Sequence, residues 1–194
     1  MGKVIYAMLV SLDGYIETTS GDLSWSFPDP ELHRHFNEEE RKVDTFLYGR
    51  RLYENMSAYW PTADQNPSAP EEEIEYARIW KDKKKIVFSN TLAQVGWNAE
   101  LFRGDIAAAV NKLKARPGKD VTVGGATLAA TFMRLGLIDE YRLYVHPILL
   151  GGGKPMFPAL RDRINLRLLE TRTFGSGVVL LRYLKIDTGI ADPL

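Results

Sequence analysis

Short apolar segments alternate with helical segments along the first 140 residues of the chain, and only strand-like segments follow. A strand, a helix and a further strand in succession require a crossover connection, which makes the two strands parallel. The last two strand-like segments are separated only by Gly175, Ser176 and Gly177, which is typical of a hairpin. The sequence therefore predicts an α/β fold with a mixed, mostly parallel central sheet and a C-terminal antiparallel hairpin. The expected strands are residues 3–10, 44–48, 85–88, 121–123, 140–150, 166–174 and 178–186.

Local signals mark where the helices begin and end. Asp29 followed by Pro30 is an N-cap with proline at the first helical position, and the helix that it opens extends to about Lys42. The segment 59–70 is rich in proline and turn-forming residues, which predicts an exposed loop. Further helices are expected over 50–56, from Pro70, after Asp105 and over 126–135.

Composition excludes several classes of function. The chain has 194 residues with 25 Lys and Arg against 25 Asp and Glu, so no net charge draws it to nucleic acid or to a membrane surface. Because it contains no cysteine, thiol nucleophiles, disulfides and thiolate metal sites are excluded, and its 3 histidines show no metal-binding spacing. We expect a small-molecule substrate, one domain over 1–187, a C-terminal tail over 188–194 and no metal. The apolar stretch in residues 1–10 is too short to span a bilayer and no cleavage site follows, so a cytoplasmic location is expected.

Residues suited to binding an anion follow three of the expected strands. In a parallel sheet the carboxyl ends of the strands share one edge, where ligands bind. Two of these segments also begin helices, whose free N–H groups and positive dipole ends attract phosphate. Each segment alone is explained as well by a tight turn, but the three together favour a phosphate site. The segments are Gly49, Arg50 and Arg51; Ser89, Asn90 and Thr91; and Gly124, Gly125, Ala126 and Thr127.

The same segments indicate which nucleotide would bind. A carboxylate commonly holds the free ribose 2′-hydroxyl of NAD, and no Asp or Glu occurs over 49–53 or 89–91. Arginine and hydroxyl side chains are better suited to a 2′-phosphate. The sequence therefore predicts NADP rather than NAD.

Four segments of the chain are similar to the dihydrofolate reductase superfamily. Within it the chain resembles the C-terminal reductase domain of bacterial RibD-type riboflavin-biosynthesis proteins, over residues 3–186. The resemblance implies a dihydrofolate-reductase-like three-layer fold, and a reductase domain without the zinc-binding deaminase half of the bifunctional proteins. The segments are SLDGYI (11–16), FLYGRRLYE (46–54), IVFSNTL (86–92) and VTVGGATLAATFMRLGLIDEYRLYVHPILLGGGKPMF (121–157), of which the last is the most specific.

The resemblance also implies NADPH as cofactor. By matching motif, Asp13 and Gly14 in the loop after the first strand would lie over the nicotinamide, although Asp13 is equally explained as a turn residue. The remaining cofactor-binding residues that it implies are Gly49, Arg50, Arg51, Ser89, Asn90, Gly124, Gly125, Ala126 and Thr127.

The position of a proton donor departs from the family pattern. Dihydrofolate reductases carry a carboxylate just after a Trp-x-x-Pro segment, where it protonates the pterin. Here the segment 25–28 is followed by Asp29, Pro30 and Glu31, so Pro30 takes the place of the acid in strict register. The candidate catalytic residues are therefore Asp13, Asp29 and Glu31, and Asp29 is also explained as a helix cap.

Trp25 and Trp60 are the candidate substrate-binding residues. Both lie in expected loops, where a large aromatic side chain either packs over the edge of the core or forms one wall of a pocket for a flat ligand. Hydride transfer requires positioning and exclusion of water more than reactive side chains, so a shortage of obvious catalytic residues is compatible with a reductase.

We therefore expect an NADPH-dependent reductase of a pyrimidine or pterin-like compound, with 5-amino-6-(5-phosphoribosylamino)uracil of riboflavin biosynthesis as one candidate. The alternatives are dihydrofolate reductase activity and a non-catalytic NADP-binding module. Segments 140–150 and 178–186 are long and apolar for sheet edges, which predicts that a second copy covers them in a homodimer, as in related reductases. The resemblance further implies a cis peptide bond between Gly124 and Gly125.

Overall fold

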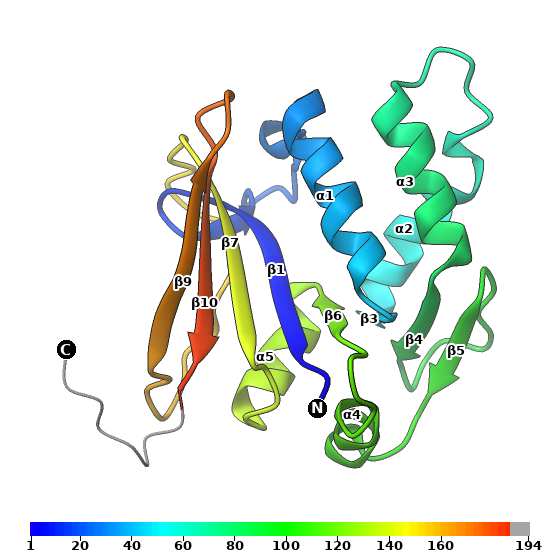
Figure 1. Ribbon diagram of the computed structural model, residues 1–194, viewed down its shortest axis with the longest axis vertical. Helices are drawn as coiled ribbons and strands as arrows, with labels where there is room; N and C mark the ends of the chain where they lie inside the picture. Colours follow the sequence, from blue (N-terminus) through cyan, green and yellow to red (C-terminus); the bar gives the residue numbers. More distant parts are fainter. Residues whose placement is uncertain (187–194) are drawn as a thin grey trace.

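The computed structural model describes residues 1–186 and contains an eight-stranded sheet with helices on both faces (Figure 1). The strand order is β5-β4-β3-β6-β1-β7-β10-β9. Neighbouring strands from β5 to β7 are parallel, whereas β10 is antiparallel to both β7 and β9. The predicted mixed sheet and C-terminal hairpin are confirmed. Residue 187 and the expected tail, 188–194, lie outside the described residues.

The elements have the following bounds. The strands of the main sheet are β1 (Val4–Ser11), β3 (Thr45–Gly49), β4 (Lys84–Phe88), β5 (Ala99–Phe102), β6 (Val121–Gly124), β7 (Glu140–His146), β9 (Leu166–Thr173) and β10 (Val179–Lys185). The helices are α1 (Pro30–Lys42), α2 (Arg50–Ala63), α3 (Glu71–Asp82), α4 (Ile106–Lys114) and α5 (Ala126–Arg134). A small second sheet joins β2 (Tyr15–Glu17) to β8 (Lys154–Pro155). Within residues 1–186, every helix is too short or too polar to cross a lipid bilayer.

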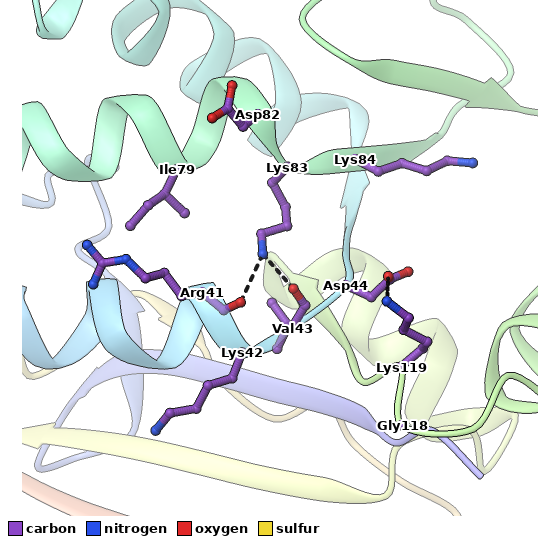
Figure 2. A pocket seen from close by; sticks show the side chains of 10 residues that line it. All are labelled: Arg41, Lys42, Val43, Asp44, Ile79, Asp82, Lys83, Lys84, Gly118 and Lys119. Carbon is purple, nitrogen blue, oxygen red and sulfur yellow. Dashed lines mark hydrogen bonds and ion pairs between the residues drawn. The ribbon is translucent and has the colours of Figure 1, made fainter.

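Both ends of α1 are fixed by side-chain hydrogen bonds. At its start, Asp29 Oδ1 accepts the Leu32 N–H at 2.8 Å, which is the predicted N-cap. At its end, Lys83 Nζ donates to the carbonyl oxygens of Arg41 at 3.3 Å and Val43 at 2.5 Å (Figure 2). These bonds satisfy backbone groups that a helix end leaves without a partner, and they hold α1 against the end of α3.

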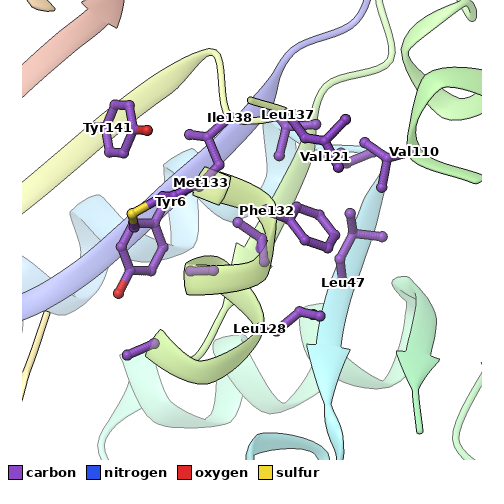
Figure 3. Close-up of a cluster of buried hydrophobic side chains, with 14 of the residues drawn as sticks. Tyr6, Leu47, Val110, Val121, Leu128, Phe132, Met133, Leu137, Ile138 and Tyr141 are labelled. Carbon is purple, nitrogen blue, oxygen red and sulfur yellow. The ribbon is translucent and has the colours of Figure 1, made fainter. Parts of the chain in front are cut away.

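The sheet has a hydrophobic core on each face because successive side chains of a strand point in opposite directions. On one face, Val4 and Tyr6 of β1 belong to a buried cluster with Phe132 of α5 (Figure 3). On the other face, Ile5 belongs to a cluster with Trp80 of α3. The helices α1, α2 and α3 therefore share one face of the sheet, and α4 and α5 share the other.

The helix α2 is longer than predicted. It continues to Ala63, so the expectation of an exposed loop over 59–70 is wrong for its first five residues. The ring of Trp60 lies 4.4 Å from that of Tyr76 on α3, and Pro61 is buried. Because Pro61 stands in the last turn, it interrupts little of the helix, and packing between α2 and α3 outweighs the turn signal.

The positions of the sheet edges also differ from the prediction. The strands β2, β5 and β8 were not predicted. The strand β7 ends at His146, four residues earlier than expected, because Pro147 cannot donate to a strand ladder. The strand β7 lies between β1 and β10, and β10 lies between β7 and β9. The expectation that segments 140–150 and 178–186 form sheet edges is therefore wrong, since the edges of the main sheet are β5 and β9.

Candidate active site

The carboxyl ends of β1, β3, β4 and β6 lie at one edge of the sheet. Tyr48 of β3 is in register with Gly124 of β6, and Gly49 of β3 is in register with Phe88 of β4. The segments that follow these strands, among them Ser89 after β4, therefore meet at this edge. We call it the carboxyl edge of the sheet.

Two helices begin at the carboxyl edge without a side-chain cap. The N-cap residues are Gly49 for α2 and Gly125 for α5, and neither can supply a capping side chain. By contrast, Asp29 caps α1 and Asp105 caps α4 through hydrogen bonds to backbone N–H groups. The first N–H groups of α2 and α5 therefore remain available, and a donor set of this kind fits the phosphates of a nucleotide.

Polar side chains stand beside these helix starts. Arg50 is exposed and forms a long ion pair of 3.4 Å with Glu54, one turn further along α2. Arg51 is exposed and has no ion pair or hydrogen bond among the described residues. Ser89 Oγ accepts the N–H groups of Thr91 at 3.2 Å and Leu92 at 3.1 Å, which shapes the turn after β4. Among the described residues of this edge, Arg51 is thus a cation that is free to meet a ligand.

The turn between β6 and α5 differs from its prediction. Residues 1–186 contain no cis peptide bond, so the expectation of one between Gly124 and Gly125 is wrong. Gly125 instead makes the turn with a φ of +83°, a conformation that favours glycine. A Cβ atom on Gly124 would lie 2.4 Å from Leu52 Cδ2. The glycine pair therefore allows close packing of this turn against α2 with an ordinary trans bond.

A large cavity lies on the sheet face that α1, α2 and α3 cover. Its volume is about 790 Å³, within the range of small-molecule sites. Its walls are mostly apolar and include Ala7 of β1, Phe36 of α1, and Leu52 and Met56 of α2. Gly124 of the carboxyl edge is also part of its lining. The cavity therefore meets the edge at which the helices α2 and α5 begin.

Glu40 of α1 lines this cavity together with two tyrosines, Tyr48 and Tyr76. Its Oε2 atom is buried and has no hydrogen-bond partner among the described residues. Burial raises the pKa of Glu40 to about 7, although the positive charges of Arg142 and Lys83 act in the opposite direction. Burial also raises the pKa of Tyr48 and of Tyr76 well above the ordinary value, so both hydroxyl groups stay protonated.

Sequence reasoning did not single out Glu40. The signal was present in the spacing, because His33, Phe36 and Glu40 follow one another at i, i+3 and i+7 and all line the cavity. Two glutamates, Glu38 and Glu39, precede Glu40 in the sequence, which makes the segment look like a solvated helix face.

The three acids proposed from the sequence lie elsewhere. Asp13 accepts hydrogen bonds from Ser11 Oγ at 2.6 Å and from the Gly151 N–H at 2.7 Å. The hydrogen bond from Ser11 is the main cause that lowers the pKa of Asp13. Asp29 is the cap of α1, and Glu31 accepts the N–H of Gly175 in the β9–β10 turn at 2.9 Å. The described lining of the cavity includes none of the three.

The structure separates the two tryptophans proposed as substrate-binding residues. Trp60 lines the cavity from α2. Trp25 packs edge-on against His146, with ring centroids 5.3 Å apart, and is absent from the described lining. Only Trp60 is therefore placed to contact a ligand in the cavity.

A second hollow of about 500 Å³ lies near the end of α1, away from the carboxyl edge (Figure 2). It is rich in lysine and arginine, but several of its polar groups bind one another. Lys83 caps α1, and Asp44 forms ion pairs with Lys119 at 3.0 Å and with Arg116 at 3.2 Å. The charged residues of this hollow are therefore explained by their role in holding the surrounding elements together. Among the described residues, no group of three His, Asp or Glu side chains is arranged to hold a metal ion.

Comparison with known proteins gives a consistent result. The profile of the RibD C-terminal domain family matches residues 2–180. A relative from Bacillus subtilis strain 168, the uncharacterized protein YyaP, is 41% identical over 182 residues, which cover 93% of this chain and 94% of the relative.

Two solved structures share the fold. RibD of Acinetobacter baumannii superposes with a TM-score of 0.69 and 19% identity, over 96% of this chain and 58% of that chain. Dihydrofolate reductase of Enterococcus faecalis, solved in complex with NADP(H), superposes with a TM-score of 0.64 and 13% identity, over 96% of this chain and 98% of that chain. These matches confirm the expected dihydrofolate-reductase-like fold and the resemblance to the RibD-type branch.

Proposed function

This chain belongs to the RibD C-terminal domain family, and we propose that it is an NADPH-dependent reductase that transfers hydride to a pyrimidine or pterin-like substrate. The observation that carries the proposal is the position of the cavity. Its lining includes both Gly124 of the carboxyl edge and Trp60 of α2. A flat ligand in the cavity can therefore reach a nicotinamide whose phosphates bind at that edge.

The chain's part in this reaction is to bind and to orient. NADPH supplies the hydride when it is bound. The free N–H groups that follow Gly49 and Gly125 would hold its phosphates, together with Arg51 and Asn90. Apolar walls such as Leu52 and Met56 would exclude water from the reacting atoms. Asp13 would act indirectly, because its carboxylate ties the loop after β1 to Gly151.

The preference for NADPH over NADH rests on charge at the carboxyl edge. No carboxylate occurs over 49–53, and Arg51 stands free at the start of α2. A guanidinium group pairs well with a phosphate dianion, whereas a ribose 2′-hydroxyl offers it much less.

Two alternatives are distinguished by the same experiment. Dihydrofolate reductase activity would require an acid near the pterin, and both Asp29 and Glu31 are engaged in structural hydrogen bonds. A non-catalytic NADP-binding module would bind NADPH at the carboxyl edge but would not transfer its hydride to any substrate.

The test follows NADPH oxidation at the nicotinamide absorbance with a panel of pterins and aminopyrimidines. The panel includes dihydrofolate and the phosphorylated ribosylaminouracil of riboflavin biosynthesis. Oxidation that depends on one of these compounds supports a reductase and names its substrate class. NADPH binding without oxidation by any compound supports the binding module, and absence of NADPH binding contradicts both.

We also propose a homodimer that pairs through β9. This strand is an edge of the main sheet and all of its residues are exposed. Leu166, Leu168 and Leu169 are 38%, 50% and 42% exposed, respectively. An eight-residue edge strand with three exposed leucines is a surface that a second copy can cover. A cytoplasmic location remains a prediction from the sequence.

A further inference from the structure

The cavity offers no free cation to a phosphate group. Arg142 is the only lysine or arginine in its described lining. Its Nη1 donates to Glu39 Oε2 at 2.6 Å and its Nε donates to Glu140 Oε1 at 2.8 Å. The positive charge of the guanidinium is therefore already balanced by two carboxylates, which leaves little net attraction for a phosphate in the cavity.

The lining from α3 adds negative charge. Glu72 and Glu73 both belong to the lining. Glu72 is paired with Arg34 of α1, and the Tyr59 hydroxyl donates to Glu73. Burial lowers the pKa of the cavity-lining His33, which disfavours the charged form of this side chain. The groups around the cavity thus disfavour an anionic ligand.

Glu40 is the polar group of the cavity whose bonding is incomplete. Its Oε2 is buried without a partner, and it forms no ion pair among residues 1–186. The nearest cations are engaged elsewhere, since Lys83 donates to backbone carbonyls and Arg142 is paired with Glu39. A buried carboxyl oxygen without a donor is unfavourable, so a ligand that brings an N–H group would satisfy it.

We propose that the cavity binds an unphosphorylated, flat heterocycle whose ring N–H or amino group donates a hydrogen bond to Glu40. The inference rests on the proposed function in taking this cavity as the substrate site. It adds the chemical class of the substrate, which excludes phosphoribosylated pyrimidines. It also assigns to Glu40 the role of positioning the ring.

The proposal carries a pH dependence with a definite sign. An N–H donor binds the ionised carboxylate more strongly than the protonated acid, because the hydrogen bond is then charge-assisted. Burial raises the pKa of Glu40 to about 7, so affinity should rise between pH 6 and pH 8. The titratable groups that face Glu40 are Glu39 of its own helix, Tyr48 of β3, Tyr76 of α3, Lys83 after α3, and Arg142 and Tyr144 of β7.

The experiment measures binding by calorimetry with two matched pairs of probes. One pair is cytidine and cytidine 5′-phosphate, and the other is 6-hydroxymethylpterin and its phosphate ester. We expect the unphosphorylated member of at least one pair to bind at least about tenfold more tightly than its phosphorylated partner. Binding of that member should strengthen about tenfold from pH 6 to pH 8.

Two variants test the role of Glu40. Glu40→Gln keeps the shape of the side chain and removes its charge, so it should weaken binding about tenfold at pH 8 and abolish the pH dependence. Glu38→Gln removes an exposed carboxylate from the same helix, outside the described cavity lining, and should change neither. Circular dichroism confirms that both variants are folded.

Three outcomes would overturn the inference: equal or tighter binding of the phosphorylated members, no binding of any of the four probes, or unchanged binding by Glu40→Gln. Failure of the proposed function looks different. If the unphosphorylated ring binds and depends on Glu40 but NADPH neither binds nor is oxidised, the cavity assignment stands and the reductase proposal falls.

Discussion

Arg142 Nη1 lies 2.6 Å from Glu39 Oε2, and this ion pair joins β7 to α1 beside the cavity. The same guanidinium binds Glu140, which is completely buried. Although burial alone would raise the pKa of Glu140, hydrogen bonds from Arg182 and Arg142 hold it at about 2. The network keeps two carboxylates ionised inside the protein and fixes the distance between α1 and the sheet.

Replacement of Arg142 by alanine should therefore be strongly destabilising. It leaves Glu39 and the buried Glu140 with fewer positive partners, and breaking such a buried pair costs about 3 kcal/mol. Urea unfolding at pH 7 measures the change. Lys42→Ala is the matched control, because Lys42 also pairs with Glu39 but is 65% exposed, so its loss should change the free energy of unfolding by less than about 0.5 kcal/mol. Equal changes in the free energy of unfolding for Arg142→Ala and Lys42→Ala would show that the buried ion pairs of Arg142 do not stabilise the fold.

Glu40→Gln should stabilise the protein at alkaline pH. The folded pKa of about 7 exceeds the ordinary value of 4.5, so the folded state binds more protons than the unfolded state between these values and stability falls as pH rises through this window. The gap corresponds to about 3 kcal/mol of stability lost by pH 8, which glutamine would restore. At pH 4, where both states are protonated, the variant should match the parent chain.

Urea unfolding of parent and variant across pH 4 to 8 checks this expectation. Glu38→Gln serves as the control, because Glu38 is exposed and its removal should give parallel curves at all pH values. A constant difference between Glu40→Gln and the parent across the range would show that Glu40 titrates normally.

The sequence predicts the elements whose local signals agree with their surroundings. Asp29 and Pro30 mark the start of α1, and the cap forms as expected. Gly49 and Gly125 mark the ends of strands at the carboxyl edge, and at Gly125 the positive φ of the strand-to-helix turn favours glycine. The alternation of strands and helices then suffices for the parallel part of the sheet.

The sequence does not predict the features that depend on contacts between residues far apart in the chain. Pro61 is a loop signal in isolation, yet contact between Trp60 and Tyr76 carries α2 past it. The cavity is hidden for the same reason, since Leu52 and Tyr76 resemble ordinary core residues until α1, α2 and α3 are placed. The run of glutamates hides Glu40 in the same way, because the spacing from Phe36 that places Glu40 on the cavity side of α1 becomes informative only once the cavity is known.

The choice of nicotinamide cofactor can be tested at Arg51. Arg51→Ala should weaken NADPH binding about tenfold and NADH binding by less than twofold, because only NADPH offers a 2′-phosphate to the guanidinium. Ser89→Ala should act in the same direction. Fluorescence titration with each cofactor gives the two dissociation constants. Arg134→Ala, at the far end of α5, is the control, and equal losses for both cofactors would show that Arg51 does not contact the 2′-phosphate.

If the protein dimerises through β9, a charged substitution on this strand should disrupt the dimer. Light scattering at micromolar concentration should show two chains, and Leu168→Lys should convert the protein to a monomer with its fold intact, since Leu168 is half exposed on the edge strand. Leu149→Lys is the control, because Leu149 is 68% exposed and lies outside the main sheet. A monomeric parent protein, or a dimer unaffected by Leu168→Lys, would contradict pairing through β9.

The loop that contains the three glycines 151–153 is fitted tightly beside β2. The Gly151 N–H donates to Asp13 at 2.7 Å, which joins the loop to the end of β1. A Cβ atom on Gly153 would lie 2.0 Å from the carbonyl oxygen of Glu17, and Gly153 has a φ of +145°. At Gly152 the nearest atom is a methyl group of Thr19 at 3.6 Å, which is an ordinary contact.

The two glycines should therefore respond differently to the same substitution. Gly153→Ala forces a side chain into a left-handed conformation and against a backbone oxygen that cannot move away, which should cost about 3 kcal/mol. Gly152→Ala meets neither obstacle and should change the free energy of unfolding by less than about 1 kcal/mol. Because the loop holds Asp13 beside the carboxyl edge, Gly153→Ala should also weaken NADPH binding at temperatures where the variant is still folded. Urea unfolding and cofactor titration of both variants measure the two effects, and similar values for the two variants would show that the loop has room to move away from Glu17.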